Sequence, residues 1–198
     1  MRLTDTIRLT RRNLPHWEIE GGRYFVTVRC ADGLPRDVVT RLQEIHLNLQ
    51  AVVPRSEMFA ASQRAYFRTM EKYLDRGLGA CVLRKPAAAQ VVISELDLLT
   101  EWQVAVPHYS VMPNHWHALL VPQAGCAHSL SEIMKRVKGR SAKGIRHRCG
   151  GTGAVWQREW FDRWVRDEAE WERIVDYIHD NPVKAGLVRA WSDHSWTR

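Results

Sequence analysis

Two histidines, His115 and His117, are the residues of this chain whose type and spacing most suggest chemistry. They stand in the run Met-Pro-Asn-His-Trp-His at positions 112–117, and the residues that follow predict a β-strand over 115–122. Because alternate side chains of a strand share a face, both imidazoles point to the same side. Neutral imidazoles so placed can bind one first-row metal ion, or join oxygen ligands around Mg²⁺ or Mn²⁺. Two ordinary hydrogen-bonded strand histidines are the alternative.

A second group of polar side chains is predicted on the last helix, which we expect to begin at the N-cap Asp167 and to end near Pro182. Its core stripe consists of Trp171, Ile174, Val175 and Ile178. At about 100° per residue, Tyr177 and Asn181 lie about 40° apart at one edge of that stripe, and Glu170 lies on the same line. A hydroxyl, an amide oxygen and a carboxylate would therefore face the sheet together. The alternatives are an edge-of-core tyrosine and an asparagine that ends the helix.

The chain is basic, with a formal net charge of +7 and a pI of about 9.5. Seven Lys and Arg side chains against one acid, Glu132, are concentrated over 129–150, where a helix is predicted from Ser129. Such an excess favours a polyanionic partner, and we expect a nucleic acid. The candidate DNA-backbone contacts are Lys135, Lys138, Arg140 and Lys143. A solvated basic helix face is the alternative.

The remaining patterns predict an α+β fold, in which helices cover one antiparallel sheet. Strands are expected at 23–30, 102–111 and 115–122, and extended runs at 155–158 and 160–166. Helices are expected at 36–51, 63–74 and 87–99, before the basic helix and the last helix. No linker divides the chain, so we expect one domain over 1–198, with a polar N-terminal segment 1–22 and a short C-terminal tail 189–198.

Several classes of protein are disfavoured by the sequence. The cysteines Cys30, Cys81, Cys126 and Cys149 form no CxxC pair, and we expect reduced thiols. No run of about 18 apolar residues and no signal peptide is visible, so we expect no membrane partner and a cytoplasmic location. A Walker-type phosphate loop is absent as well, which argues against ATP-driven chemistry.

Two long strings resemble the single-tyrosine HUH transposases. The string Tyr-Ser-Val-Met-Pro-Asn-His-Trp-His-Ala-Leu-Leu-Val at 109–121 is similar to their histidine motif. The string Asp-Tyr-Ile-His-Asp-Asn-Pro-Val-Lys-Ala-Gly-Leu-Val at 176–188 is similar to their tyrosine helix. Shorter stretches at 14–17 with 23–27, at 75–79 and at 155–158 resemble the subgroup of REP-associated tyrosine transposases.

The resemblance implies a ferredoxin-like fold of the HUH endonuclease type, with a divalent metal, Mg²⁺ or Mn²⁺, on His115 and His117. It implies that Tyr177 is the nucleophile, which forms a 5′-phosphotyrosine link with single-stranded DNA, and that Asn181 is a further metal ligand. It also implies recognition of short palindromic hairpins, and it leaves monomer and homodimer open. Arg163 stands where relatives often carry histidine. A domesticated hairpin-binding protein without cleavage is therefore the main alternative, and another hydrolytic metalloenzyme is the last.

Overall fold

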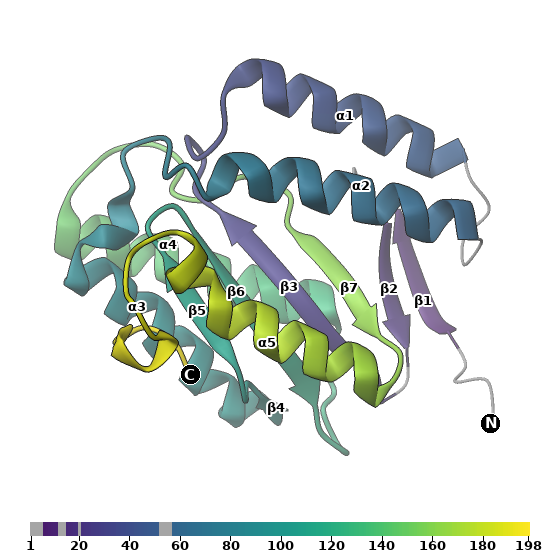
Figure 1. The fold of residues 1–198 in the computed structure, drawn as a ribbon. Helices are drawn as coiled ribbons and strands as arrows, with labels where there is room; N and C mark the ends of the chain where they lie inside the picture. Colours follow the sequence, from purple (N-terminus) through teal and green to yellow (C-terminus); the bar gives the residue numbers. More distant parts are fainter. Residues whose placement is uncertain (1–5, 12–14, 20, 52–56) are drawn as a thin grey trace.

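A five-stranded antiparallel sheet forms the centre of the protein (Figure 1). The computed structural model describes residues 6–11, 15–19, 21–51 and 57–198. The strands are β3 (Arg23–Arg29), β4 (Val104–Ala105), β5 (Tyr109–Met112), β6 (His115–Pro122) and β7 (Phe161–Val165). Along the sheet the order is β4-β6-β3-β7, and β5 also pairs with β6. The two strands at the centre, β3 and β6, are therefore the most enclosed, and they carry the residues described below.

Helices cover both faces of this sheet (Figure 1). On one face lie α1 (Arg36–Ala51), α2 (Glu57–Leu74) and α5 (Glu168–Lys184). On the other face lie α3 (Pro86–Asp97) and α4 (Leu130–Cys149), which pack against each other. Short 3₁₀ helices run over Val82–Arg84, Leu98–Trp102 and Trp191–Asp193. The expected α+β arrangement of one antiparallel sheet between helices is confirmed.

The alternation of β6 divides the core into two parts. Trp116, Ala118 and Leu120 are fully buried in the cluster that contains the apolar residues of α3 and α4. Leu119 is buried in the cluster of α1, α2 and α5, and His117 packs on the same side, stacked on Phe25 with ring centroids 5.5 Å apart. The predicted two-faced character of this strand is therefore confirmed, and the histidines face α2 and α5.

Most predicted elements are present, three differ by more than two residues or are broken, and the expected extended run 155–158 forms only an isolated bridge between Trp156 and Cys30. The expected strand 102–111 is broken, because Gln103 adopts a left-handed conformation at φ 56° and only Val104–Ala105 and Tyr109–Met112 pair. Helix α2 begins at Glu57, six residues before the predicted start at Gln63. Pro182 does not end α5, which reaches Lys184, since the amide of Ala185 still donates to the Asn181 carbonyl at 3.0 Å.

Both ends of the chain are more structured than the sequence suggested. Within the predicted polar segment 1–22, strands β1 (Thr6–Arg11) and β2 (Pro15–Ile19) form an antiparallel hairpin. At the other end, the amide of Arg198 donates to the Tyr109 carbonyl, and the carbonyl of Arg198 accepts from the Tyr109 amide, both at 2.9 Å. The C-terminal tail is thus bound along the edge strand β5.

The four cysteines are free thiols, as expected. In the parts of the chain that the structure describes, no helix is both long and apolar enough to cross a membrane.

Candidate metal and tyrosine site

His115 is oriented by its neighbour Asn114. Both side chains are completely buried at the start of β6. The Asn114 Nδ2 group donates to the Leu78 carbonyl at 3.0 Å, which turns Oδ1 towards the Nδ1 atom of His115 at 2.8 Å. An amide oxygen can only accept, so His115 carries its proton on Nδ1. The lone pair of Nε2 is then free to bind a metal ion.

His117 has an equivalent anchor on the neighbouring strand. Thr27 of β3 lies opposite His117 in the sheet, and its Oγ1 atom is 2.8 Å from Nδ1. Burial lowers the pKa of His115 to about 3. Burial first, and then the proximity of His115, lower the pKa of His117 well below its ordinary value. Both imidazoles are therefore neutral at physiological pH, which is the form that binds metals.

Helix α5 brings Tyr177 to these histidines. The Tyr177 hydroxyl is 3.3 Å from His117 Nε2, and Asn181 Nδ2 donates to the same hydroxyl at 3.1 Å. The ring packs edge-on against Phe25 and Phe67, at centroid distances of 5.8 and 5.5 Å. The expectation that the tyrosine helix packs against the histidine strand is met, and a single chain contributes both halves.

A residue that the sequence reading missed, Glu71 of α2, completes the group. Its Oε2 atom accepts a hydrogen bond from the Tyr177 hydroxyl, and its Oε1 atom is 3.8 Å from His117 Nε2. Burial raises the pKa of this carboxyl, the negative charge of Asp75 raises it further, and a hydrogen bond from Asn181 opposes both. In the sequence, Glu71 stands between the core residues Met70 and Leu74. Its place beside core positions of the helix was the only sign in the sequence that this carboxylate is buried.

The donor atoms of this group fit a divalent metal ion. Ligand atoms of Glu71, His115 and His117 all lie within 4.8 Å of one another. Three buried atoms lack a hydrogen-bond partner among the described residues: His115 Nε2, Glu71 Oε1 and Asn181 Oδ1. Since a buried polar atom without a partner is costly, the unpaired atoms of Glu71 and His115 in this cluster favour a bound cation, and the unpaired Asn181 Oδ1 is a candidate further ligand. Two imidazole nitrogens and two oxygens suit a first-row or alkaline-earth divalent ion.

Glu170, which the helical spacing placed on the line of Tyr177, does not reach this group. It is buried at the start of α5, where its carboxylate pairs with Arg163 and accepts the backbone amide of Arg166 at 3.0 Å. Seven residues of helix separate it from Tyr177, which is about 10 Å along the axis. The carboxylate at the site therefore comes from α2, and Glu170 neutralises the arginine of β7.

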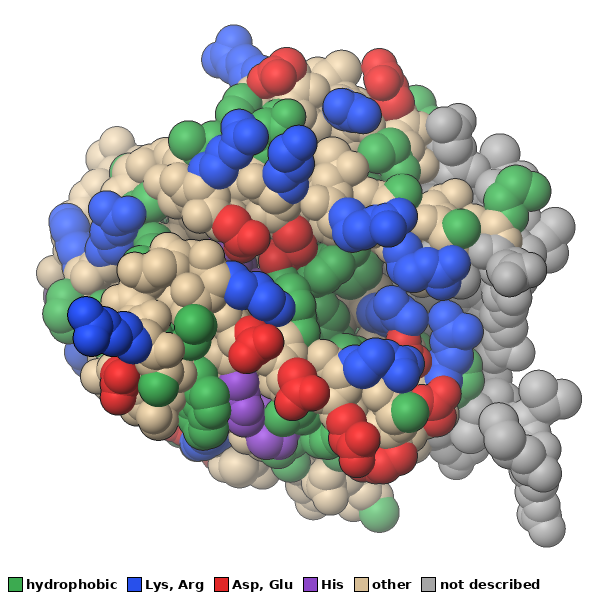
Figure 2. Space-filling view, in the orientation of Figure 1, with side chains coloured by type: hydrophobic (Ala, Val, Ile, Leu, Met, Phe, Trp, Pro, Cys, Tyr) green, Lys and Arg blue, Asp and Glu red, His purple; other side chains and the backbone are tan. Residues whose placement is uncertain are grey.

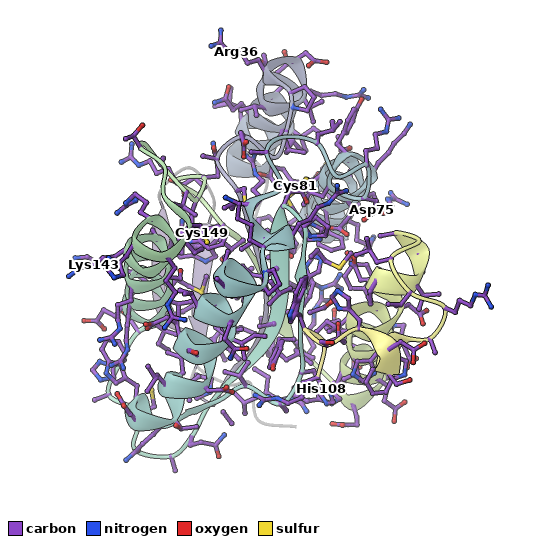
Figure 3. The ribbon with its side chains drawn as sticks, turned by 90° about the vertical axis from the view of Figure 1, so that its left-hand side faces the viewer. Arg36, Asp75, Cys81, His108, Lys143 and Cys149 are labelled. Carbon is purple, nitrogen blue, oxygen red and sulfur yellow. The ribbon has the colours of Figure 1, made fainter. Side chains whose placement is uncertain are left out.

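The basic helix α4 lies on the opposite face of the sheet from the histidines, and two of its four candidate DNA contacts are engaged within the protein. Figure 3 shows α3 and α4 on one side of the sheet and α5 on the other, with Lys143 pointing outward. Lys138 donates to the carbonyls of Gln157 and Arg158 at 2.9 and 2.6 Å, and burial lowers its pKa to about 8. Arg140 pairs with Glu95 at 2.7 Å.

Lys135 and Lys143 are exposed, and neither has an ion pair with the described residues. They are therefore the two members of the predicted set that are free to contact a ligand. Lys138 instead fastens the segment before β7 to α4, a role that sequence alone could not reveal.

On the face that carries the site, a hollow runs between α2 and α5 (Figure 2). Hydrophobic side chains form its floor, and Lys and Arg side chains gather near the start of α5 (Figure 2). Arg163 of β7 pairs with Glu170 at the start of α5. Burial lowers the pKa of Arg163, Glu170 opposes this, and Arg166 and Arg64 lower it further. Three guanidinium groups, from α2, from β7 and from the short connection between β7 and α5, thus interact with one another on this face.

Comparison with known families identifies the central part of the chain. Residues 84–181 match the family model described as "Transposase IS200 like". The chain carries an IS200-like transposase domain. This domain contains four site residues, His115, His117, Tyr177 and Asn181, whereas Glu71 precedes it.

Two curated relatives match part of the chain. An uncharacterized protein of Haemophilus influenzae is 26% identical over 101 residues, which cover 41% of this chain and 56% of the relative. The REP-associated tyrosine transposase of Escherichia coli strain K12 is 31% identical over 83 residues, which cover 42% of this chain and 47% of the relative. The chain thus spans about half the length of the curated relatives it matches.

A solved structure, described as a REP-associated tyrosine transposase bound to a REP hairpin, shows the same fold. The likeness covers 100% of this chain and 79% of that chain, with a TM-score of 0.50 and 20% identity. The expected HUH-type fold, an antiparallel sheet with helices packed on it, is therefore confirmed.

Proposed function

We propose that this protein is a DNA transposase that nicks and rejoins single-stranded DNA with Tyr177 as the nucleophile. The observation that carries the proposal is the position of the Tyr177 hydroxyl, 3.3 Å from His117 Nε2 and beside buried ligand atoms without partners. Because all of these groups come from one chain, a homodimer is not needed to complete the site. A single domain over 1–198 and a cytoplasmic location agree with this function and stay predictions.

The metal ligands in this proposal are His115, His117 and Asn181, and the ion is Mg²⁺ or Mn²⁺. When bound, the ion supplies a positive charge that stabilises the phosphoryl oxygens in the transition state. Asn114 and Thr27 hold the two imidazoles with Nε2 facing the ion. The amide oxygen of Asn181 adds a hard ligand, which favours Mg²⁺ or Mn²⁺ over softer metals.

The reaction exchanges one phosphate ester for another. The Tyr177 oxygen forms a bond to phosphorus, and the bond from phosphorus to the 3′ oxygen breaks. The tyrosine loses its proton and the leaving 3′ oxygen gains one, so the products are a 5′-phosphotyrosine and a free 3′-OH. The ester energy is retained in the enzyme–DNA bond, so the released 3′-OH can attack it and reseal the strand without ATP.

The substrate we propose is a DNA hairpin with an adjacent single strand. One structural relative is described as bound to a REP hairpin. The exposed Lys135 and Lys143 of α4 would contact the phosphates of the duplex stem. The hollow between α2 and α5, with its apolar floor and arginines, would hold the single strand that reaches Tyr177.

The test uses labelled hairpin DNA with a single-stranded flank, Mg²⁺ or Mn²⁺, and a denaturing gel. We expect an adduct that survives denaturation, is absent without metal, and disappears in Tyr177→Phe. Binding of the hairpin without an adduct under either metal would contradict cleavage. It would leave the alternative of a non-catalytic hairpin-binding protein.

A further inference from the structure

Helix α2 contributes a carboxylate to a site whose other members all belong to the IS200-like domain. Glu71 precedes residues 84–181, which match the family model. Its side chain is nevertheless buried, with 8% of the residue exposed, and points at Tyr177 and His117. A carboxylate is seldom buried unless it is paired, so this position calls for a physical explanation.

The two oxygens of Glu71 have different surroundings. Oε2 accepts the hydrogen bond of the Tyr177 hydroxyl. Oε1 has no hydrogen-bond partner among the described residues and lies 3.8 Å from His117 Nε2. The hydrogen bond to tyrosine therefore explains one oxygen and leaves the other, buried and unpaired, on the side of the histidines.

Nearby charges compensate this carboxylate only in part. Asp75, directly after the end of α2, has the same sign and acts against it. Lys184 interacts favourably with Glu71, but its Nζ atom is 3.5 Å from Asp180 and lies over the Tyr177 ring at 5.7 Å. A cation between the histidines and Oε1 would balance both the charge and the unpaired oxygen.

We propose that Glu71 is a ligand of the divalent metal through Oε1 and a positioning residue for Tyr177 through Oε2. This inference rests on the proposed function, because it requires a metal at His115 and His117. Glu71 would supply the negative charge that two neutral imidazoles and the neutral amide of Asn181 lack. One carboxylate would then contact both the metal and the nucleophile. It would also link α2 to the histidines of β6 and to Tyr177 of α5.

The first test is a titration of the DNA-free protein with Mn²⁺ alone, with bound metal read by electron paramagnetic resonance. Glu71→Gln keeps the size of the side chain and an acceptor for Tyr177, but removes the charge. Substitution of groups that only support a ligand lowers metal affinity about 10- to 100-fold, so we expect a loss of at least about tenfold here. Mn²⁺ should also raise the melting temperature of the wild-type protein, and raise it less in Glu71→Gln.

Asp75→Asn is the matched control, since it removes a nearby negative charge, four residues after Glu71 and just beyond the end of α2, without removing a ligand. We expect its Mn²⁺ affinity to stay within about twofold of wild type, because exposed charges act weakly through solvent. An equal loss in Asp75→Asn and Glu71→Gln would show a general effect of charge and overturn the ligand assignment.

Two further results separate this inference from the function on which it rests. A wild-type protein that binds no Mn²⁺ would contradict the metal site itself, and Glu71 with it. If the wild-type protein binds Mn²⁺ and Glu71→Gln binds it equally tightly, only the role of Glu71 is overturned. If Glu71→Gln does not fold, a crystal of the wild-type protein soaked in Mn²⁺ decides: we expect a Glu71 oxygen about 2.0–2.4 Å from the ion, and a Glu71 outside coordinating distance would refute the proposal.

Discussion

Replacement of Thr27 by valine tests whether the sheet sets the chemical state of the metal-binding imidazoles. Thr27 is 1% exposed, and its Oγ1 atom is 2.8 Å from His117 Nδ1. Valine has nearly the same shape, so the substitution removes this hydrogen bond without opening a cavity. In the tautomer that leaves Nε2 free for a metal, His117 donates from Nδ1 to Thr27 Oγ1. In Thr27→Val that proton either stays on Nδ1 without a partner or moves to Nε2, where it blocks the ligand lone pair.

The cost of both outcomes can be worked out. An unsatisfied buried donor costs about 1–3 kcal/mol. Loss of a hydrogen bond that orients a metal-binding histidine lowers metal affinity about 10- to 100-fold, which is about 1.4–2.8 kcal/mol. The two ranges agree, so we expect Thr27→Val to weaken Mn²⁺ binding by that factor.

The assay is a titration of the DNA-free protein with Mn²⁺, together with thermal unfolding to verify the fold. Thr40→Val is the control, because Thr40 is exposed and its hydroxyl only donates to the Arg36 carbonyl within α1 at 3.1 Å. It should leave Mn²⁺ affinity unchanged. A Thr27→Val protein that is folded and binds Mn²⁺ as the wild type does would refute the idea that Thr27 orients His117.

Four other outcomes follow from the same structure. A mixture of the inactive variants Tyr177→Phe and His115→Ala should form no covalent adduct, since one chain holds both halves of the site; recovered activity would show exchange between subunits. Asp167→Ala should lower the free energy of unfolding by about 1 kcal/mol in urea, because Asp167 caps α5 by accepting the amide three residues on. Lys138→Ala should lower the melting temperature, whereas Lys143→Ala should weaken hairpin binding and reduce the salt dependence of that binding by about one ion. Equal effects of the two substitutions on the melting temperature would contradict a structural role for Lys138 and a DNA-contacting role for Lys143. The free energy of unfolding should fall as the pH is lowered below about 6.5, because His115 binds a proton in the unfolded chain but, with a pKa of about 3, stays neutral in the folded protein. Urea unfolding of His115→Gln should show a smaller dependence of the free energy of unfolding on pH.

Periodicity was enough to predict the elements that carry the tyrosine and the histidines. The strand 115–122 and the helix 36–51 have the limits that the sequence predicted, and Asp167 caps α5. The alternation of β6 also predicted that Trp116 faces away from the histidines, as it does. These properties depend on neighbours in the chain, which a sequence displays directly.

The features that the sequence did not predict depend on contacts between distant segments. Glu71 and Thr27 reach the site from α2 and β3, and nothing in their local sequence marks a polar role. Glu170 was placed at the site by helical angle alone, but its distance along α5 puts it on Arg163 instead. Lys138 was counted as a surface charge, although tertiary packing buries it on two carbonyls.

The most direct test of the account is to find which residue becomes attached to DNA. Tryptic digestion of the adduct should release residues 174–184, a peptide between Arg173 and the cleavage after Lys184 whose only tyrosine is Tyr177. Mass spectrometry should find this peptide, and no other, with the added mass of a 5′-phosphorylated nucleotide. An adduct on a peptide that contains a different tyrosine, or active cleavage that leaves residues 174–184 unmodified, would contradict the role of Tyr177.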